Sequence, residues 1–205
     1  MKKIILSAIA IFTIGFVNAQ KAQFGVKGGL NLAVILGDTD GVDFQSKAGY
    51  HVGGFVDIKV SDKISIQPEL LYSTQGASVK DFEVELNNTL YSADVNFNLS
   101  YINIPVMLKY YAAEKFNLEV GPQIGFLTAA KIVAKVNGNE GEEDAKDIFE
   151  SVDFGLNLGA GYDFTKKISA GVRYNVGLSN IEKTESGDDS KIKNSVFSLS
   201  LGYKF

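Results

Sequence analysis

The chain alternates between apolar and polar residues along most of its length. The clearest example is its final segment, where every second residue is apolar: Phe197, Leu199, Leu201, Tyr203 and Phe205. Successive side chains of a β-strand point to opposite sides, so this period of two predicts a strand with one apolar and one polar face. The segments that alternate in this way are 23–32, 50–60, 64–73, 102–110, 116–126, 153–164, 168–178 and 197–205. The pattern therefore predicts an all-β protein with eight strands.

The connections between these segments alternate in length. The short ones, at 61–63, 112–115 and 165–167, each end in a lysine, and these lysines recur every 52 residues. A recurring hairpin unit predicts a meander in which neighbouring strands pair. Short turns at one end and long loops at the other are typical of outer-membrane barrels, with the turns in the periplasm and the loops outside the cell. We therefore expect an eight-stranded antiparallel up-and-down transmembrane β-barrel that the final strand closes.

One face of the predicted strands is nearly free of charge, and the other carries charged residues. The charged face includes Lys27, Asp57, Glu69, Glu119 and Arg173. A basic residue that faces lipid at the middle of a bilayer costs about 2–4 kcal/mol. The charges are therefore expected in the lumen, and the apolar residues are expected against lipid.

Residues 1–19 have the pattern of a secretory signal peptide. Lys2 and Lys3 precede an apolar run, and small residues lead to a cleavage site near Ala19. The run is too short to span a bilayer, and no later segment approaches about 18 consecutive apolar residues. We expect one barrel domain over 20–205 in the cell outer membrane. Loss of the two lysines changes the formal net charge from -4 to -6, which argues against a nucleic-acid partner.

The charges predicted to face the lumen include two at matching depth. Glu69 lies six residues beyond Lys63 in its strand. Arg173 lies six residues beyond Lys167. Unpaired buried charges are costly, so we expect a lumenal ion-pair network, with a path for protons or a solute as the alternative. The expected members are Lys27, Asp57, Glu69, Glu119 and Arg173. An eight-stranded barrel has an interior just wide enough for side chains to fill it, which disfavours a general diffusion pore.

The single histidine, His51, is predicted to point inward near the extracellular end of its strand. A histidine with serine or acidic partners can act as a catalytic base, and Ser73 and Asp153 are the candidates. Lone polar residues at a barrel mouth need no chemistry to explain them, so the structural interpretation is preferred. No catalytic residue and no cofactor is assigned.

The predicted extracellular loops are acidic. Asp38, Asp40 and Asp43 occur at positions that resemble a calcium loop, although Gly49 stands where such a loop has a glutamate. Residues 137–150 carry six further carboxylates. A soluble, repelling surface is the simpler interpretation, and a calcium site at the three aspartates is the alternative.

Residues 79–99 continue the alternation beyond the expected membrane span. Apolar residues at every second position flank Asn87 and Asn88. This predicts a protruding hairpin whose edges expose backbone donors and acceptors, which suits strand addition by a protein partner. A stiff loop without a partner is the alternative.

Two features complicate the strand pattern. Pro68, Pro105 and Pro122 lie inside predicted strands, where each removes a backbone donor, and bulges could absorb them. The apolar phase also reverses after Tyr101, which predicts a bulge at that point.

Four motifs lie along the predicted strands: Ile66-Gln-Pro-Glu-Leu70, Tyr101-Ile-Asn-Ile-Pro-Val-Met-Leu-Lys-Tyr110, Glu119-Val-Gly-Pro-Gln-Ile-Gly125 and Gly202-Tyr-Lys-Phe205. Together they closely resemble the porin-family, or PorT-like, outer-membrane β-barrel proteins of Bacteroidetes. The resemblance covers nearly the whole chain after the signal and implies an eight-stranded barrel in the outer membrane. The prolines belong to its motifs. It supplies no catalytic motif.

The function expected from these observations is that of a non-enzymatic outer-membrane barrel. It would support the envelope, display loops or bind a protein. The alternatives are a lipid-modifying or proteolytic barrel enzyme centred on His51 and a narrow channel. The expected partners are outer-membrane lipid, a protein at the 79–99 hairpin and the barrel-assembly machinery, which would read the C-terminal strand with Phe197, Leu199, Leu201, Tyr203 and Phe205.

Overall fold

The computed structural model describes residues 22–37, 43–86, 89–136, 139–183 and 191–205. The predicted signal peptide over 1–19 lies outside these ranges, and its cleavage stays a prediction. Within the described ranges, the model contains no helix with the length and apolar character needed to cross a membrane.

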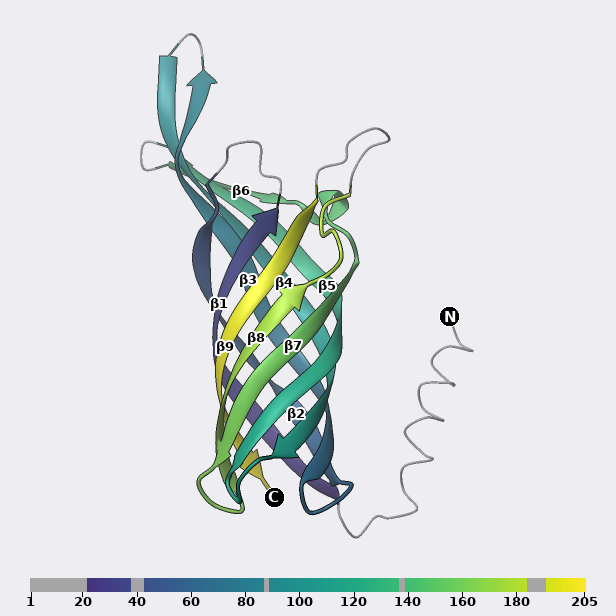
Figure 1. The fold of residues 1–205 in the computed structure, drawn as a ribbon. Coiled ribbons are helices and arrows are strands. Elements are labelled where there is room, and N and C mark those ends of the chain that lie inside the picture. Colours follow the sequence, from purple (N-terminus) through teal and green to yellow (C-terminus); the bar gives the residue numbers. More distant parts are fainter. Residues whose placement is uncertain (1–21, 38–42, 87–88, 137–138, 184–190) are drawn as a thin grey trace.

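Eight strands form a closed cylinder (Figure 1). In chain order they pair as neighbours, β4 pairs with β5, and β9 returns to β1 from Gly25↔Lys204 to Gly37↔Ile192. Every pairing is antiparallel. The strands of the barrel are β1 (Ala22–Gly37), β2 (Gln45–Lys59), β3 (Ile64–Leu86), β4 (Thr89–Tyr111), β5 (Phe116–Val136), β7 (Val152–Asp163), β8 (Ile168–Gly177) and β9 (Ile192–Lys204). The prediction of an all-β antiparallel barrel that closes through its last strand is confirmed.

A ninth strand, β6 (Asn139–Asp144), was not predicted from the sequence. It pairs with the upper part of β5, from Lys131↔Asp144 to Val136↔Asn139, and does not take part in the ring. The segment has no alternation of apolar and polar residues, so it reads as an acidic loop. It becomes a strand because β5 continues to Val136 and offers it an edge.

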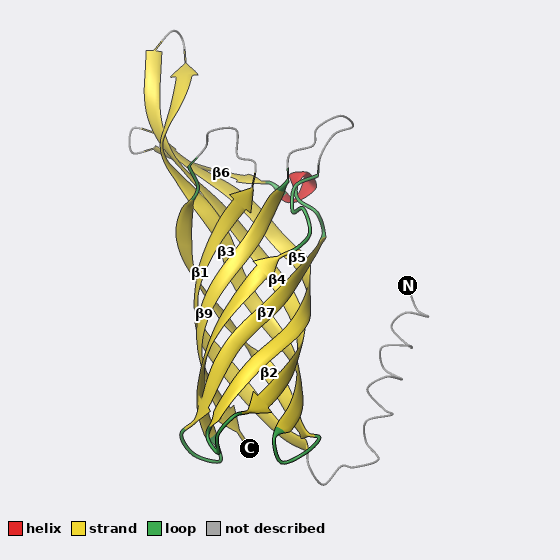
Figure 2. Ribbon diagram, in the orientation of Figure 1, coloured by secondary structure: helices red, strands yellow, loops and turns green. Residues whose placement is uncertain are grey.

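The wall of the barrel is uneven in height. β3, β4 and β5 have 23, 23 and 21 residues, whereas β7 and β8 have 12 and 10. The long strands extend above the rest at the end with the long connections, here called the long-loop end (Figure 2). The predicted hairpin within 79–99 is present and pairs out to Leu86↔Thr89. A bulge between Val79 and Phe82 precedes it, with Asp81 at a φ of 54°.

The three short turns lie at the opposite end of the cylinder, together with the start of β1 and the C-terminus (Figure 1). This is the short-turn end. The backbone bond from Val60 N to Ile64 O, at 2.9 Å, closes the first turn. The side chain of Thr165 accepts a bond from Ile168 N at 2.9 Å in the third.

The outer face of the cylinder is apolar. Large side chains on it are exposed, by more than half at Leu30 (67%), Leu70 (57%) and Leu199 (53%). The side chains of the predicted C-terminal assembly signal all lie on this face: Phe197, Leu199, Leu201, Tyr203 and Phe205. In a water-soluble barrel these residues would be buried, so the arrangement is inside out.

The three prolines are accommodated without bulges, which the sequence had left open. Along each strand, the register before the proline continues unchanged after it. Toward one neighbouring strand, however, the proline itself is not paired: this strand is β2 for Pro68, β3 for Pro105 and β4 for Pro122. A missing N–H removes a ladder bond without requiring an extra residue.

A register shift does occur next to Tyr101, as predicted. The extra residue is Thr128 of β5, however, because β4 keeps an unbroken register with β3 at this level. Leu99, Tyr101 and Asn103 are all buried on the inner side of β4. The apolar phase reverses after Tyr101 because the lumen itself changes from apolar to polar there.

Candidate functional site

The side chains that fill the lumen form four successive groups. From the short-turn end they are a floor of two ion pairs, a central cluster of charges, an amide layer and an apolar cap. Each group contains residues from strands distant in sequence, because every second residue of all eight barrel strands points inward. The lumen is therefore the place to look for chemistry.

The central cluster is built around Glu69 and Arg173. The guanidinium donates two bonds to the carboxylate, Nη1 to Oε2 and Nη2 to Oε1, both at 3.0 Å. The Glu69 side chain has no exposed surface, and 10% of the Arg173 side chain is exposed. Such a bidentate pair fixes geometry as well as charge. The contact is the one that their equal depth above the short turns predicted.

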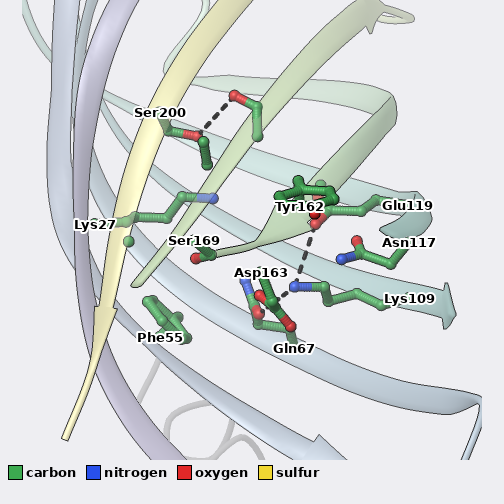
Figure 3. Close-up of a pocket in the computed structure, with 14 residues that line it drawn as sticks. Lys27, Phe55, Gln67, Lys109, Asn117, Glu119, Tyr162, Asp163, Ser169 and Ser200 are labelled. Carbon is green, nitrogen blue, oxygen red and sulfur yellow. Dashed lines mark hydrogen bonds and ion pairs between the residues drawn. The ribbon is translucent and has the colours of Figure 1, made fainter. Parts of the chain in front are cut away.

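The remaining charges extend this pair across the lumen. Lys27 Nζ lies 3.3 Å from Glu69 Oε1, and Arg173 Nη2 donates to Glu119 Oε2 at 2.8 Å. Lys109 Nζ lies 3.3 Å from Glu119 Oε1. Lys109 was not predicted as a member, although the alternation on its strand places it inward. Figure 3 shows Lys109 reaching Glu119 and Gln67, while Lys27 points into the lumen from another strand.

Asp57 was predicted in this network but belongs to the floor. Lys204 Nζ lies 2.9 Å from Asp57 Oδ2 and 3.7 Å from Asp163 Oδ2. Tyr111 donates its hydroxyl to Asp163 at 3.3 Å. Phe55 of β2 is the partner of Glu69 on β3. Asp57 follows Phe55 by two residues in the direction of the short turn at 61–63, so it lies nearer the short-turn end than Glu69 does. Depth in the barrel separates it from the cluster.

The charges of these two groups balance. The central cluster has three cations and two anions, and the floor has one cation and two anions, so the eight together are neutral. The members are Lys27, Lys109, Arg173 and Lys204, and Asp57, Glu69, Glu119 and Asp163. Buried charges are tolerated when each has a partner of opposite sign. Pairing alone accounts for their presence.

The amide layer lies above the central cluster and contains His51. His51 Nδ1 lies 2.8 Å from Asn31 Oδ1, and Asn31 donates to Ser73 Oγ at 3.0 Å. Ser73 also accepts from Gln75 at 2.9 Å. On the far side, Asn175 donates to Asn157, which donates to Gln123, both at 3.2 Å.

The geometry around His51 is not that of a catalytic triad. Its Nδ1 partner is an amide, and the hydroxyl of Ser73 accepts bonds from amides. Asp153 instead accepts a 2.7 Å bond from Ser179. A nucleophile must share a hydrogen bond with its base, and the contacts of the described residues place no such pair at His51.

The apolar cap is a buried cluster that closes the lumen at the long-loop end. Strands β1, β3, β4 and β5 supply most of it, and the loops after β6 and β8 supply the rest. Its buried members are Ile35, Ala77, Leu99, Tyr101, Leu127, Ala130, Ala145, Phe149 and Ile181. The two loops are tied together by bonds from Glu150 N to Ile181 O at 2.8 Å and from Lys183 N to Ile148 O at 2.9 Å.

Two cavities inside the described lumen are very small. One of about 20 Å³ lies between the floor and the central cluster, and one of about 30 Å³ lies in the amide layer. Each has room for a water molecule or two. A larger recess of about 840 Å³ opens among the short turns, where Lys63, Glu114 and Lys166 are among its lining residues. The described lumen is packed rather than channel-like.

The calcium prediction lies largely outside the described residues. Asp38 and Asp40 are not among them, and Asp43 is exposed. Across the described ranges, no three histidine, cysteine, aspartate or glutamate side chains are grouped so that they could hold a metal ion. A calcium site at these aspartates therefore stays a prediction.

Comparisons with known proteins agree with this architecture. Neisserial surface protein A superposes with a TM-score of 0.54 at 12% identity, over 90% of this chain and 99% of that one. The attachment invasion locus protein Ail of Yersinia pestis gives a TM-score of 0.51 at 12% identity, with the same coverage. At these identities the likeness shows the fold.

No curated protein sequence matches the chain. The family described as the outer membrane protein beta-barrel domain matches residues 18–183, which is most of its length. The chain therefore belongs to the outer membrane protein beta-barrel domain family and is located in the outer membrane.

Proposed function

We propose that this protein is a non-enzymatic anchor that holds a binding surface outside the cell. In the orientation typical of outer-membrane barrels, the short turns face the periplasm and the long-loop end faces the exterior of the cell. The filled lumen is the observation that carries the proposal. Ion pairs close its middle and the apolar cap closes its outer mouth, so recognition falls to the extracellular surface.

The tall wall of β3, β4 and β5 provides that surface. Its hairpin continues past the last pairing of β2 with β3, at Gln45↔Ser78, and past the last pairing of β4 with β5, at Ala93↔Val136. Beyond these pairs no other strand in the described ranges pairs with either edge of the hairpin. Such edges bind extended segments of other proteins by strand addition.

We further infer that the chain is of the porin-family, PorT-like type of Bacteroidetes. The four sequence motifs around the prolines and at the C-terminus support this. Lipid at the apolar outer face and the barrel-assembly machinery at the C-terminal strand are the partners expected of such a barrel.

Crosslinking in intact outer membranes, followed by affinity capture, tests the anchor function. The matched variant lacks residues 84–91 and joins Glu83 to Ser92 through Asn-Gly, which suits a two-residue hairpin turn. Because Glu83 and Ser92 already pair, the barrel should keep its fold, as judged by circular dichroism. A partner captured by the full-length protein should be lost from the variant. Equal capture by both proteins would contradict the role of the hairpin.

A further inference from the structure

β6 has a free edge on the outside of the cell. One side of this strand pairs with β5, and no other strand in the described ranges pairs with its second side. All six of its residues are exposed. Figure 1 shows β6 across the upper part of the barrel.

The register identifies which backbone groups point to the free edge. Ala145, directly after β6, donates its N–H to Ala130 O of β5 at 3.0 Å. In an antiparallel pair, the residues whose backbone groups face the partner alternate with those whose groups face away. Glu140, Glu142 and Asp144 therefore present their N–H and C=O groups to the free edge.

The same three residues share one face of the sheet, since they are spaced by two. On β5 the corresponding positions are Lys131 and Lys135, which lie opposite Asp144 and Glu140. Lys131 Nζ donates to Glu142 Oε1 at 2.5 Å. On this face, β5 therefore presents Lys131 and Lys135 on either side of Val133, which lies opposite Glu142. Its other face carries Ile132, Ala134 and Val136.

We propose that the free edge of β6 binds an extended segment of another protein that is rich in lysine or arginine, by strand addition. The incoming strand pairs with the free edge of β6 and places basic residues beside its carboxylates, as β5 does at the paired edge. Carboxylates at alternate positions oppose pairing between two copies of β6, because like charges directly across strands are destabilising. The charge pattern therefore rejects self-association and selects a basic partner. This rests on the proposed extracellular binding function, but it uses a different edge from that of the hairpin.

The test uses the full barrel in phosphatidylcholine nanodiscs, so that the lipid carries no net charge. The probes are three eight-residue peptides: alternating Lys and Val, alternating Glu and Val, and the Lys-Val peptide with one central Val replaced by Pro. Binding is measured by fluorescence anisotropy. The Lys-Val peptide should bind at least about tenfold more tightly than either of the others, a difference of about 1.4 kcal/mol.

Two variants of one residue separate the backbone edge from the charge. Glu142→Ala removes one carboxylate and keeps the outward N–H, whereas Glu142→Pro removes both. A proline is tolerated where its missing N–H faces away from the sheet, so the β5–β6 pairing should survive. Hydrogen exchange of the β5 amides checks this. We expect a few-fold loss of affinity for Glu142→Ala and at least about a tenfold loss for Glu142→Pro.

Other outcomes would overturn the inference. Equal affinity of the two Glu142 variants would show that no backbone edge is used, and equal binding of the acidic peptide would remove the charge selection. Absence of binding to the wild-type barrel would also reject it, without affecting capture through the hairpin. If loss of residues 84–91 abolished peptide binding and Glu142→Pro did not, the hairpin would be the site. Should Glu142→Pro disturb β5, the combined change Glu140→Gln, Glu142→Gln and Asp144→Asn still tests the charge.

Discussion

The central cluster and the apolar cap fill the same lumen by different physical means. In the cluster, five charges hold one another through directed contacts such as the bidentate Glu69–Arg173 pair. In the cap, nine buried side chains from the described strands and loops pack against one another. Removing one ion leaves its buried partners with fewer opposite charges, whereas removing one methyl group leaves only a gap. The cluster should therefore respond abruptly to substitution, and the cap should respond in proportion to the volume lost.

The largest expected effect is that of Arg173→Ala. It leaves Glu69 with Lys27 alone and takes one of two cations from Glu119. Breaking a buried pair by removing one partner costs about 3–5 kcal/mol. Urea unfolding in detergent micelles should show this loss of stability. Lys131→Ala, which breaks an exposed ion pair, is the control and should change stability little. Equal effects of both changes would contradict the importance of burial.

In the cap, Leu99→Ala should have the next largest effect. Leu99 is 1% exposed, and its side chain packs among those of other strands and loops. Truncating a buried leucine costs about 2–5 kcal/mol, in proportion to the cavity left behind. Leu178, at the same end and 55% exposed, supplies the control variant Leu178→Ala. Leu99→Met should restore most of the stability because it refills the volume. If it did not, packing would be the wrong explanation for the cap.

The same contrast explains what could be predicted from the sequence. Alternation places a residue on the inner face, so the inward position of Lys27, Glu69, Glu119 and Arg173 followed from the chain alone. The depth of a residue in the lumen is harder to predict, since it depends on how the tilted strands are staggered around the barrel. Counting from the short turns aligned Glu69 with Arg173, but without such a count Asp57 was assigned to the wrong level.

The cap and β6 were missed for a different reason. The cap depends on Phe149 and Ile181, which lie in loops where no periodicity indicates a direction. Its trace in the strand pattern is the reversed phase of Leu99 and Tyr101, which by itself predicts a bulge and not a change in what fills the lumen. β6 has no apolar face of its own and exists because β5 is long enough to pair with it. Both features are set by tertiary contacts.

His51→Ala should have a smaller effect, which tests the enzyme alternative. The change removes the 2.8 Å contact with Asn31 Oδ1, but that oxygen keeps a donor in Ser198 at 2.9 Å. A neutral hydrogen bond of this kind contributes about 1 kcal/mol, so stability should fall by that order. The wild-type protein and the His51→Ala variant should show the same turnover of phospholipid or of a peptide. A loss of turnover with intact folding would instead support catalysis at His51.

The smallest expected effect is on ion conductance, where the cluster and the cap act in series. The wild-type protein in planar bilayers should conduct no ions beyond the bare lipid, because either group alone closes the lumen. Phe149→Ala thins the cap, yet it should leave conductance at the baseline, since the contacts of Arg173 with Glu69 and Glu119 still cross the lumen below. Arg173→Ala should also give no current, because the cap remains. Conductance in either single variant would show that one of the two groups does not close the barrel, and conductance in the wild type would favour a narrow channel.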